Sequence, residues 1–226
     1  MKREDLTQTI EDYLKTIYQF TLEQQRATTN QIAESLRVTP ASVTGMLKKL
    51  AATEPPLVEY KKHYGVRLTP AGEKIALEIV RHHRLLEMFL VQILGYEWDE
   101  VHTEADRLEH HISEAFEERI AEALGDPLRD PHGNPIPTRE LAIQELNDVP
   151  LRSLRPGQQA IVQRVRETDP ELLRRVATLG LVPEARIEVI EYSPLDENLS
   201  LAIAGQVGSV VLGKGITDQV FVKVVN

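Results

Sequence analysis

Hydrophobic periodicity constrains this chain most, because its period changes once along the sequence. Up to about residue 124, apolar residues recur every three or four positions, as on one face of an amphipathic helix. From Pro150 onward they alternate with polar residues, most clearly in ARIEVIEY, as in half-buried strands. The sequence therefore predicts a multi-domain, mainly α-helical protein that ends in a small β-barrel or sandwich of about five strands.

Three helices are predicted in the first 52 residues. Apolar residues at helical spacing predict the first over residues 5–23. Two short helices follow in TTNQIAESLRVTPASVTGMLKKLAA. Thr28 or Thr29 can cap the first of these, and Thr39 followed by Pro40 is typical of an N-cap and first-turn proline for the second.

A basic hairpin follows these helices. The segments LVEY and VRLT flank KKHYG, a pattern typical of a short hairpin with Gly65 in its turn. Two short helices and such a hairpin predict a winged helix-turn-helix, whose second helix enters the DNA major groove; a plain helical subdomain with solvated lysines is the alternative. The candidate DNA contacts are short hydroxyl side chains and lysines: Thr39, Ser42, Thr44, Lys48, Lys49, Lys61 and Lys62.

The middle of the chain is predicted to hold two long helices, from Thr69-Pro70 to near Gly95 and from about Asp99 to Leu124. The segment GDPLRDPHGNPIPT is rich in Pro and Gly and reads as an ordered loop or linker. A short helix is expected around residues 140–146. The two long helices need a partner surface for their apolar stripes.

The distribution of charge divides the chain into nearly the same segments as the hydrophobic periodicity does. Residues 1–75 carry 11 Lys or Arg against 9 Asp or Glu, residues 76–150 carry 6 against 17, and the remainder carries 9 against 9. The net charge of -9 would argue against a nucleic-acid partner, but the acidic excess lies in the middle segment. The longest apolar runs are far shorter than the roughly 20 residues of a membrane-spanning helix. We expect a cytoplasmic protein with no membrane partner.

Any bound metal must be held by oxygen and imidazole nitrogen, because the chain has no cysteine. Five of the 7 histidines lie between residues 82 and 111, in the acidic segment. On the first long helix, His83 and Glu87 are four residues apart and share a face. The second long helix is predicted to present four candidate ligands on one face: His102, Asp106, Glu109 and His110. Facing helices of this kind predict a metal site, whereas a solvated acidic face is the alternative.

Several segments resemble, in order, signatures of the diphtheria-toxin-repressor family of metalloregulators, including its manganese-responsive members. They span the whole chain and read EDYLKTIY, PASVTGMLKKL, HRLLEMFL, VHTEADRLEHHIS and GNPIP. The resemblance implies a winged helix-turn-helix domain over residues 1–75 and a helical dimerisation and metal-binding domain over residues 76–147. It also implies an SH3-like, FeoA-like domain over residues 148–226.

The resemblance further implies two metal sites. The principal site would use Asp12, Asp106, Glu109 and His110. The ancillary site would use His83, Glu87 and His102, with Asp169 or Glu171 adding a ligand from the C-terminal domain. Manganese-responsive members carry carboxylates at the positions of Asp12 and Asp106, where iron-responsive members carry methionine and cysteine. Lys15 stands where an additional glutamate can occur in manganese-responsive members, and is a departure from their pattern for a closely spaced two-metal cluster.

The sequence thus predicts a homodimeric repressor of metal-homeostasis genes that binds an inverted-repeat operator in double-stranded DNA when Mn(II) or Fe(II) is bound. One alternative is a di-metal carboxylate enzyme, although such helical bundles use Glu-x-x-His on each of two helices and only a loosely similar Asp106-x-x-Glu109-His110 occurs here. The other alternative is a metal-independent winged-helix regulator whose acidic module only dimerises.

Overall fold

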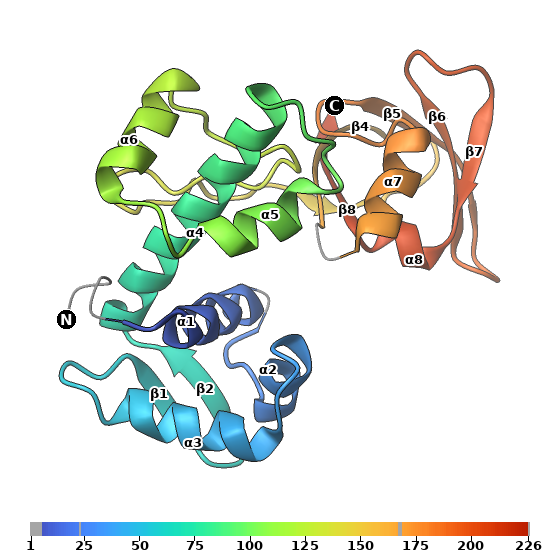
Figure 1. Cartoon of the computed structure of the whole chain (residues 1–226). Helices are drawn as coiled ribbons and strands as arrows, with labels where there is room; N and C mark the ends of the chain where they lie inside the picture. The colour runs from blue at the N-terminus through green and yellow to red at the C-terminus, as the bar shows by residue number, and fades with distance from the viewer. Residues whose placement is uncertain (1–5, 23, 167–168, 226) are drawn as a thin grey trace. The chain divides into compact units, whose positions relative to one another are not determined.

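The computed structural model describes residues 6–22, 24–166 and 169–225, which form two compact units (Figure 1). The first unit runs up to His82 and includes Glu109–Ile112 and Pro137–Ala142. The second contains His83–Leu108, Ser113–Ile136 and the chain from Ile143 onward. Among the described residues, no helix is long and apolar enough to cross a membrane.

The first unit begins with three helices, α1 (Gln8–Thr21), α2 (Thr29–Ser35) and α3 (Pro40–Ala51). The predicted ends of the first helix, residues 5 and 23, lie outside the described residues. Helix α2 begins in a capping box, in which the Thr28 side chain accepts a hydrogen bond from the Gln31 backbone N–H. The predicted cap of α3 is confirmed, since the Thr39 side chain accepts from the Ser42 backbone N–H.

Strands β1 (Val58–Lys61) and β2 (Gly65–Leu68) pair antiparallel and form the predicted hairpin. Its turn needs a left-handed backbone, with a φ of 68° at His63 and 91° at Gly65. A Cβ atom at Gly65 would also lie 2.5 Å from the Ala27 carbonyl oxygen. Glycine is therefore required here both for conformation and for space.

Helices α4 (Pro70–Gln92), α5 (Val101–Leu108) and α6 (Glu114–Ala123) form the middle of the chain. The prediction of one helix from about Asp99 to Leu124 was wrong, because the chain turns at residues 109–113 and Ser113 caps α6 by accepting from the Phe116 N–H. Residues 140–146, all of them described, form no helix, so that prediction was also wrong. There Leu141 has a φ of 64°.

The C-terminal β domain is a six-stranded antiparallel sheet in the order β3-β8-β4-β5-β6-β7. Its strands are β3 (Val149–Pro150), β4 (Gln159–Val165), β5 (Arg186–Ser193), β6 (Asn198–Ile203), β7 (Ser209–Leu212) and β8 (Val220–Val225). About five strands were predicted, and the sixth, β3, is only two residues long. Alternation places Leu199, Leu201 and Ile203 of β6 in the core.

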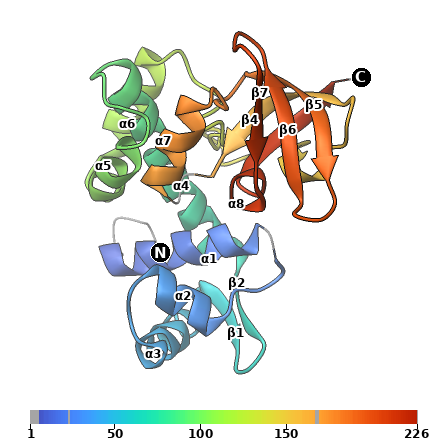
Figure 2. The ribbon, with the colours of Figure 1, turned by 90° about the vertical axis from the view of Figure 1, so that its right-hand side faces the viewer.

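Two helices accompany this sheet, α7 (Pro170–Thr178) and the short α8 (Lys214–Thr217). Leu173 and Val176 of α7 belong to the same buried core as the strands, and Figure 2 shows α7 beside the sheet. The multi-domain, mainly helical architecture with a terminal β domain is as predicted. Partly buried Trp98, from the segment between α4 and α5, packs against this core.

Candidate metal centre

Five charged residues meet beside helix α1, and we call them the α1 cluster: Glu11, Asp12, Lys15, Glu109 and His110. The first three lie on one side of α1, because Glu11 and Asp12 stand four and three residues before Lys15, and both spacings bring side chains together on a helix. The other two lie in the turn directly after α5, not on the single helix face predicted for them. The break in that helix therefore brings Glu109 and His110 to α1.

His110 is the centre of the α1 cluster. Its Nε2 lies 3.0 Å from Asp12 Oδ1 and 3.4 Å from Glu109 Oε1, and its Nδ1 donates to Glu11 Oε2 over 2.5 Å. Burial lowers the pKa of His110, but hydrogen bonds to Asp12 and Glu11 and the charge of Glu109 outweigh burial and raise this pKa to about 9. The imidazole of the metal-free protein is therefore positively charged at neutral pH.

Glu11 holds His110 in the orientation that a metal ligand needs. A carboxylate that accepts from one ring nitrogen directs the other nitrogen toward a metal, and here that other nitrogen faces Asp12 and Glu109. Asp12, Glu109 and His110 each offer one ligand atom within 4.8 Å of the others. Sequence reasoning missed Glu11, because a carboxylate beside a candidate ligand carries no periodic signal.

Lys15 supplies a second positive charge to the α1 cluster. Its Nζ lies 2.6 Å from Glu109 Oε2, and both residues are buried. Glu109 thus presents one oxygen to the lysine and the other to His110. Lys15, which stands where an additional glutamate can occur in the family, therefore contacts a candidate metal ligand directly.

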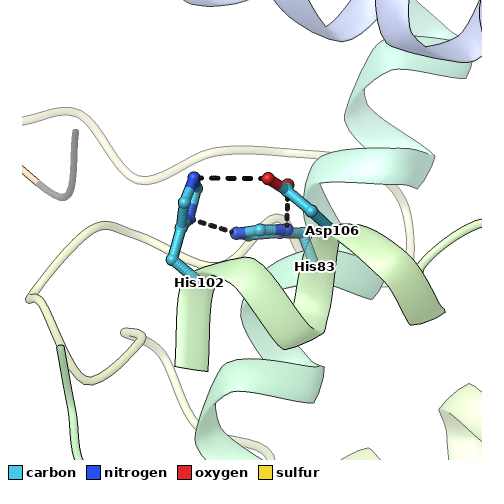
Figure 3. Close-up of side chains that lie close together, drawn as sticks. All are labelled: His83, His102 and Asp106. Atoms are coloured by element: carbon cyan, nitrogen blue, oxygen red, sulfur yellow. Dashed lines mark hydrogen bonds and ion pairs between the residues drawn. The ribbon is translucent and has the colours of Figure 1, made fainter. Parts of the chain in front are cut away.

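A second group, the α4 cluster, contains His83 and Glu87 of α4, His102 and Asp106 of α5, and His132. Figure 3 shows His83, His102 and Asp106 converging from the two helices. Asp106 Oδ1 lies 3.3 Å from His83 Nδ1, and Asp106 Oδ2 lies 3.6 Å from His102 Nε2. The structure therefore places Asp106 with the residues expected for the ancillary site.

Three ligand atoms of the α4 cluster form a nearly equilateral triangle. His83 Nε2 lies 2.9 Å from both Glu87 Oε1 and His102 Nδ1, and His102 Nδ1 lies 3.1 Å from Glu87 Oε1. Octahedral sites with metal–ligand bonds of about 2.1 Å have edges of about 3 Å, so this donor set fits a divalent ion. Burial raises the pKa of Glu87, but the charge of His83 and hydrogen bonds from His102 and His83 hold this pKa well below its ordinary value.

His132 faces the opposite oxygen of Glu87. The His132 Nδ1 lies 3.6 Å from Glu87 Oε2, while its Nε2 donates to the Trp98 carbonyl oxygen over 2.8 Å. Glu87, His132 and nearby Asp130 are all buried and form a further group with metal-ligand spacing. Sequence reasoning treated this segment as a loop and missed both Asp130 and His132; a buried histidine in a loop has no periodicity, although GNPIP marked the segment.

Asp169 and Glu171 have a different role in this structure. Asp169 caps α7 by accepting a hydrogen bond from the Glu171 backbone N–H over 2.9 Å, and both side chains are exposed. In the part of the chain that the structure describes, neither joins a group with metal-ligand spacing.

The candidate DNA contacts lie on α3 and the hairpin. Lys48 and Lys49 are exposed in the last turn of α3, and Lys61 and Lys62 are exposed on the hairpin. Near the start of α3, the three hydroxyl side chains make local hydrogen bonds, between Thr39 and Ser42 and from Thr44 to the Pro40 carbonyl. Exposed Gly45 has nothing within 4 Å of a Cβ position, so this face of α3 is open.

Comparisons with known proteins cover all three parts of the chain. The model for the iron dependent repressor N-terminal DNA binding domain matches residues 5–66, that for the iron dependent repressor metal binding and dimerisation domain matches residues 69–138, and that for the FeoA domain matches residues 149–224. A solved structure described as a manganese-dependent transcriptional repressor in complex with manganese is 37% identical, with a TM-score of 0.89, and the match covers 96% of this chain and 100% of that one.

Two curated relatives are also metal-responsive or DNA-binding regulators by name. The HTH-type transcriptional regulator MntR of Bacillus pumilus is 39% identical over 118 residues, which cover 52% of this chain and 80% of that protein. The iron-dependent repressor IdeR of Mycobacterium leprae is 33% identical over 213 residues, which cover 89% of this chain and 91% of the relative. The expected winged helix-turn-helix, helical and SH3-like architecture is confirmed, and the enzyme alternative is excluded. The chain belongs to the iron-dependent repressor family of metal-dependent, DNA-binding regulators of metal homeostasis.

Proposed function

We propose that this repressor is activated by Mn(II), with Fe(II) as a second activator, and that it binds an inverted-repeat operator as a homodimer. The observation that carries the choice of metal is the donor set of the α1 cluster, which joins Asp12 and Glu109 carboxylates to the His110 imidazole. Oxygen-rich sites without sulfur suit manganese, whereas thiolate or thioether ligands suit softer ions. One relative is named an iron-dependent repressor and one similar solved structure a manganese-dependent repressor, which supports the same class of metal.

We assign one ion to the α1 cluster, because Lys15 already supplies a fixed positive charge there. Glu11, Asp12 and Glu109 bring three negative charges, and the Lys15 ammonium balances one of them. One divalent ion together with neutral His110 makes the cluster neutral. A second divalent ion would add two uncompensated positive charges in a buried setting, which is costly.

We assign a second ion to the α4 cluster, held by Glu87 Oε1, His83 Nε2 and His102 Nδ1, while Asp106 faces the other ring nitrogen of each histidine and would orient both rings. His132 is an additional candidate ligand through Nδ1, since its tautomer is set by the hydrogen bond from Nε2 to the Trp98 carbonyl. The two groups would give two ions in each protomer.

The α1 cluster combines residues of the segment matched as a DNA-binding domain with residues of the segment matched as a metal-binding domain. Helix α1 belongs to the segment matched as a DNA-binding domain, while Glu109 and His110 directly follow α5 in the segment matched as a metal-binding and dimerisation domain. Asp12 and the turn at 109–110 would hold the same ion, which supplies the positive charge that keeps these carboxylates together. This restraint would raise the population of the conformation that fits two successive major grooves.

We place the DNA contacts on α3 and the hairpin. The lysines there would contact phosphates, and the short side chains near the start of α3 would approach base edges. A symmetric dimer matches an inverted repeat, because each half-site meets the same surface. Several large apolar side chains of the dimerisation segment are exposed and offer an interface: Ile93, Leu94, Tyr96, Phe116 and Leu128. This activity belongs in the cytoplasm, where the operator DNA lies.

The test is metal-dependent operator binding. A duplex is selected from a random library by the Mn(II)-loaded protein, and its binding is followed by fluorescence anisotropy in buffered free Mn(II). Asp12→Asn should abolish the response to manganese, whereas the control Asp126→Asn, an exposed acid outside both clusters, should retain it. Equal DNA binding with and without a chelator in the parent protein would contradict the proposal.

A further inference from the structure

The exposed face of the hairpin formed by β1 and β2 combines cations with a carboxylate. Glu59 and Lys61 stand two residues apart on β1, so their side chains project from the same face of the strand. Arg67 is the direct partner of Glu59 on β2, and all three residues are exposed. Val58 and Val66 alternate with them and are buried on the other face. The Glu59 carboxylate therefore lies on the same face as Lys61, a candidate phosphate contact.

Glu59 engages two arginines at once. The Arg67 Nε donates to Glu59 Oε2 over 2.7 Å, and Arg67 Nη2 lies 2.7 Å from the same oxygen. Arg26, from the segment before α2, donates from Nη1 to the Glu59 carbonyl oxygen over 3.2 Å, and its Nη2 lies 3.6 Å from Glu59 Oε2. The hydrogen bond from Arg67 and the charges of both arginines lower the pKa of Glu59, so this carboxylate is ionised at neutral pH.

The fold of the hairpin does not depend on these ion pairs. Strands β1 and β2 pair over their full length, and the Ala27 and Val66 backbones exchange two hydrogen bonds of 2.9 Å, which hold the segment of Arg26 against β2. Ala27 and Val66 are also fully buried. Ion pairs between exposed side chains add little to stability, because water screens the charges and long side chains lose freedom. The charged side chains can therefore be replaced without loss of the hairpin.

Arginine binds a phosphate with the same donors that it uses for a carboxylate. Both anions accept hydrogen bonds from the planar guanidinium, often two at once. In this hairpin, Glu59 occupies donors of both Arg26 and Arg67. Contacts with phosphates supply the sequence-independent part of DNA affinity. Glu59 thus competes with DNA for two cations of the DNA-binding domain.

We propose that Glu59 restrains sequence-independent DNA binding by occupying the guanidinium groups of Arg26 and Arg67. The proposal rests on the proposed contact between the hairpin and DNA. A repressor must find its operator among many competing sites, so weak binding to those sites leaves more of it available for the operator. Glu59 is then a specificity-determining residue that acts without reading a base.

The test is binding of the Mn(II)-loaded, full-length protein to the selected operator and to a scrambled duplex of equal length, over a range of salt concentrations. Glu59→Gln should bind the scrambled duplex more tightly, with a salt dependence steeper by about 0.9 units of slope for each arginine that reaches a phosphate. Each such contact is worth roughly 8-fold in affinity at 0.1 M salt relative to 1 M. The ratio of operator affinity to scrambled-duplex affinity should fall.

The control Glu73→Gln removes the same charge from an exposed position on α4 and should bind both duplexes as the parent does. A salt dependence in Glu59→Gln equal to that of the parent overturns the proposal.

A double-mutant cycle separates occupation of the arginines from plain repulsion of DNA by the carboxylate. Arg67→Gln should cost the parent little affinity for the scrambled duplex, because Glu59 already holds this arginine. The same change should remove most of the affinity that Glu59→Gln gains. Equal losses in the two proteins would mean that Glu59 only repels phosphates, and would overturn the proposed competition.

A further comparison requires no change at Glu59. Replacing Arg26 and Arg67 together by glutamine should reduce the salt dependence much less than replacing Lys61 and Lys62 together, because the arginines are occupied and the lysines are the proposed phosphate contacts. Equal reductions overturn the role of Glu59 and leave the hairpin as a DNA contact. If the lysine variant bound both duplexes as the parent does, while Mn(II) still activated operator binding, the proposed placement of DNA on the hairpin would fail instead.

Discussion

Replacing Lys15 tests the electrostatics of the α1 cluster most directly. Lys15→Met keeps the length of the side chain but removes the ammonium that lies 2.6 Å from Glu109 Oε2. Glu109 is 1% exposed, so the metal-free variant carries a buried carboxylate without this partner. Breaking a buried ion pair costs about 3–5 kcal/mol. For a chain of this size, 1 kcal/mol shifts the midpoint of thermal unfolding by about 2–4 °C, so a drop on the order of 10 °C is expected.

Manganese should reverse much of this loss, since the bound ion would compensate Glu109 in place of the ammonium. The assay is thermal unfolding of both proteins with chelator and with saturating Mn(II), and the stabilisation by Mn(II) should be larger in Lys15→Met. Lys15→Glu adds a fourth carboxylate and should raise the number of Mn(II) ions bound, counted by equilibrium dialysis. If Lys15→Met lost the same stability with and without Mn(II), the lysine would not share its role with a metal, and the reasoning would fail.

Three further predictions follow from the two clusters and the DNA-binding face. The folded-state pKa of His110 is about 9 against an ordinary 6.5, so its contribution to metal-free stability is complete below pH 6.5 and is lost as pH rises through 9. Urea unfolding of the metal-free parent should show this decline in stability, and urea unfolding of His110→Gln should not. Lys48→Ala should weaken binding to every duplex and reduce the salt dependence by about one unit of slope, whereas Ser42→Ala should change sequence preference in a selection experiment. Asp12→Met replaces a hard oxygen by a thioether, so anisotropy titrations should show a larger loss of activation by Mn(II) than by Fe(II).

Much of the fold could be predicted from sequence, because its signals are local. The period of the apolar residues reports which face of each helix or strand is buried, and caps such as Thr28 and Thr39 act within a few residues of themselves. Spacing also predicted one half of a site, since His83 and Glu87 share a helix face whatever surrounds them.

Local signals conflicted where the second long helix was expected. The apolar stripe continues across residues 109–113, so periodicity alone predicts an unbroken helix. The Ser113 side chain provides a competing cap, and the chain turns there. Sequence therefore predicted Glu109 and His110 as ligands but placed them on the wrong kind of element.

Tertiary structure alone decided which candidate ligands meet. Asp106 lies against His83, Glu11 orients His110, and His132 reaches Glu87 from a loop. Each contact joins residues at least 15 positions apart in the chain, where neither helical spacing nor turn chemistry applies. Their partners depend on how whole elements pack, which is set by burial of apolar surface elsewhere in the protein.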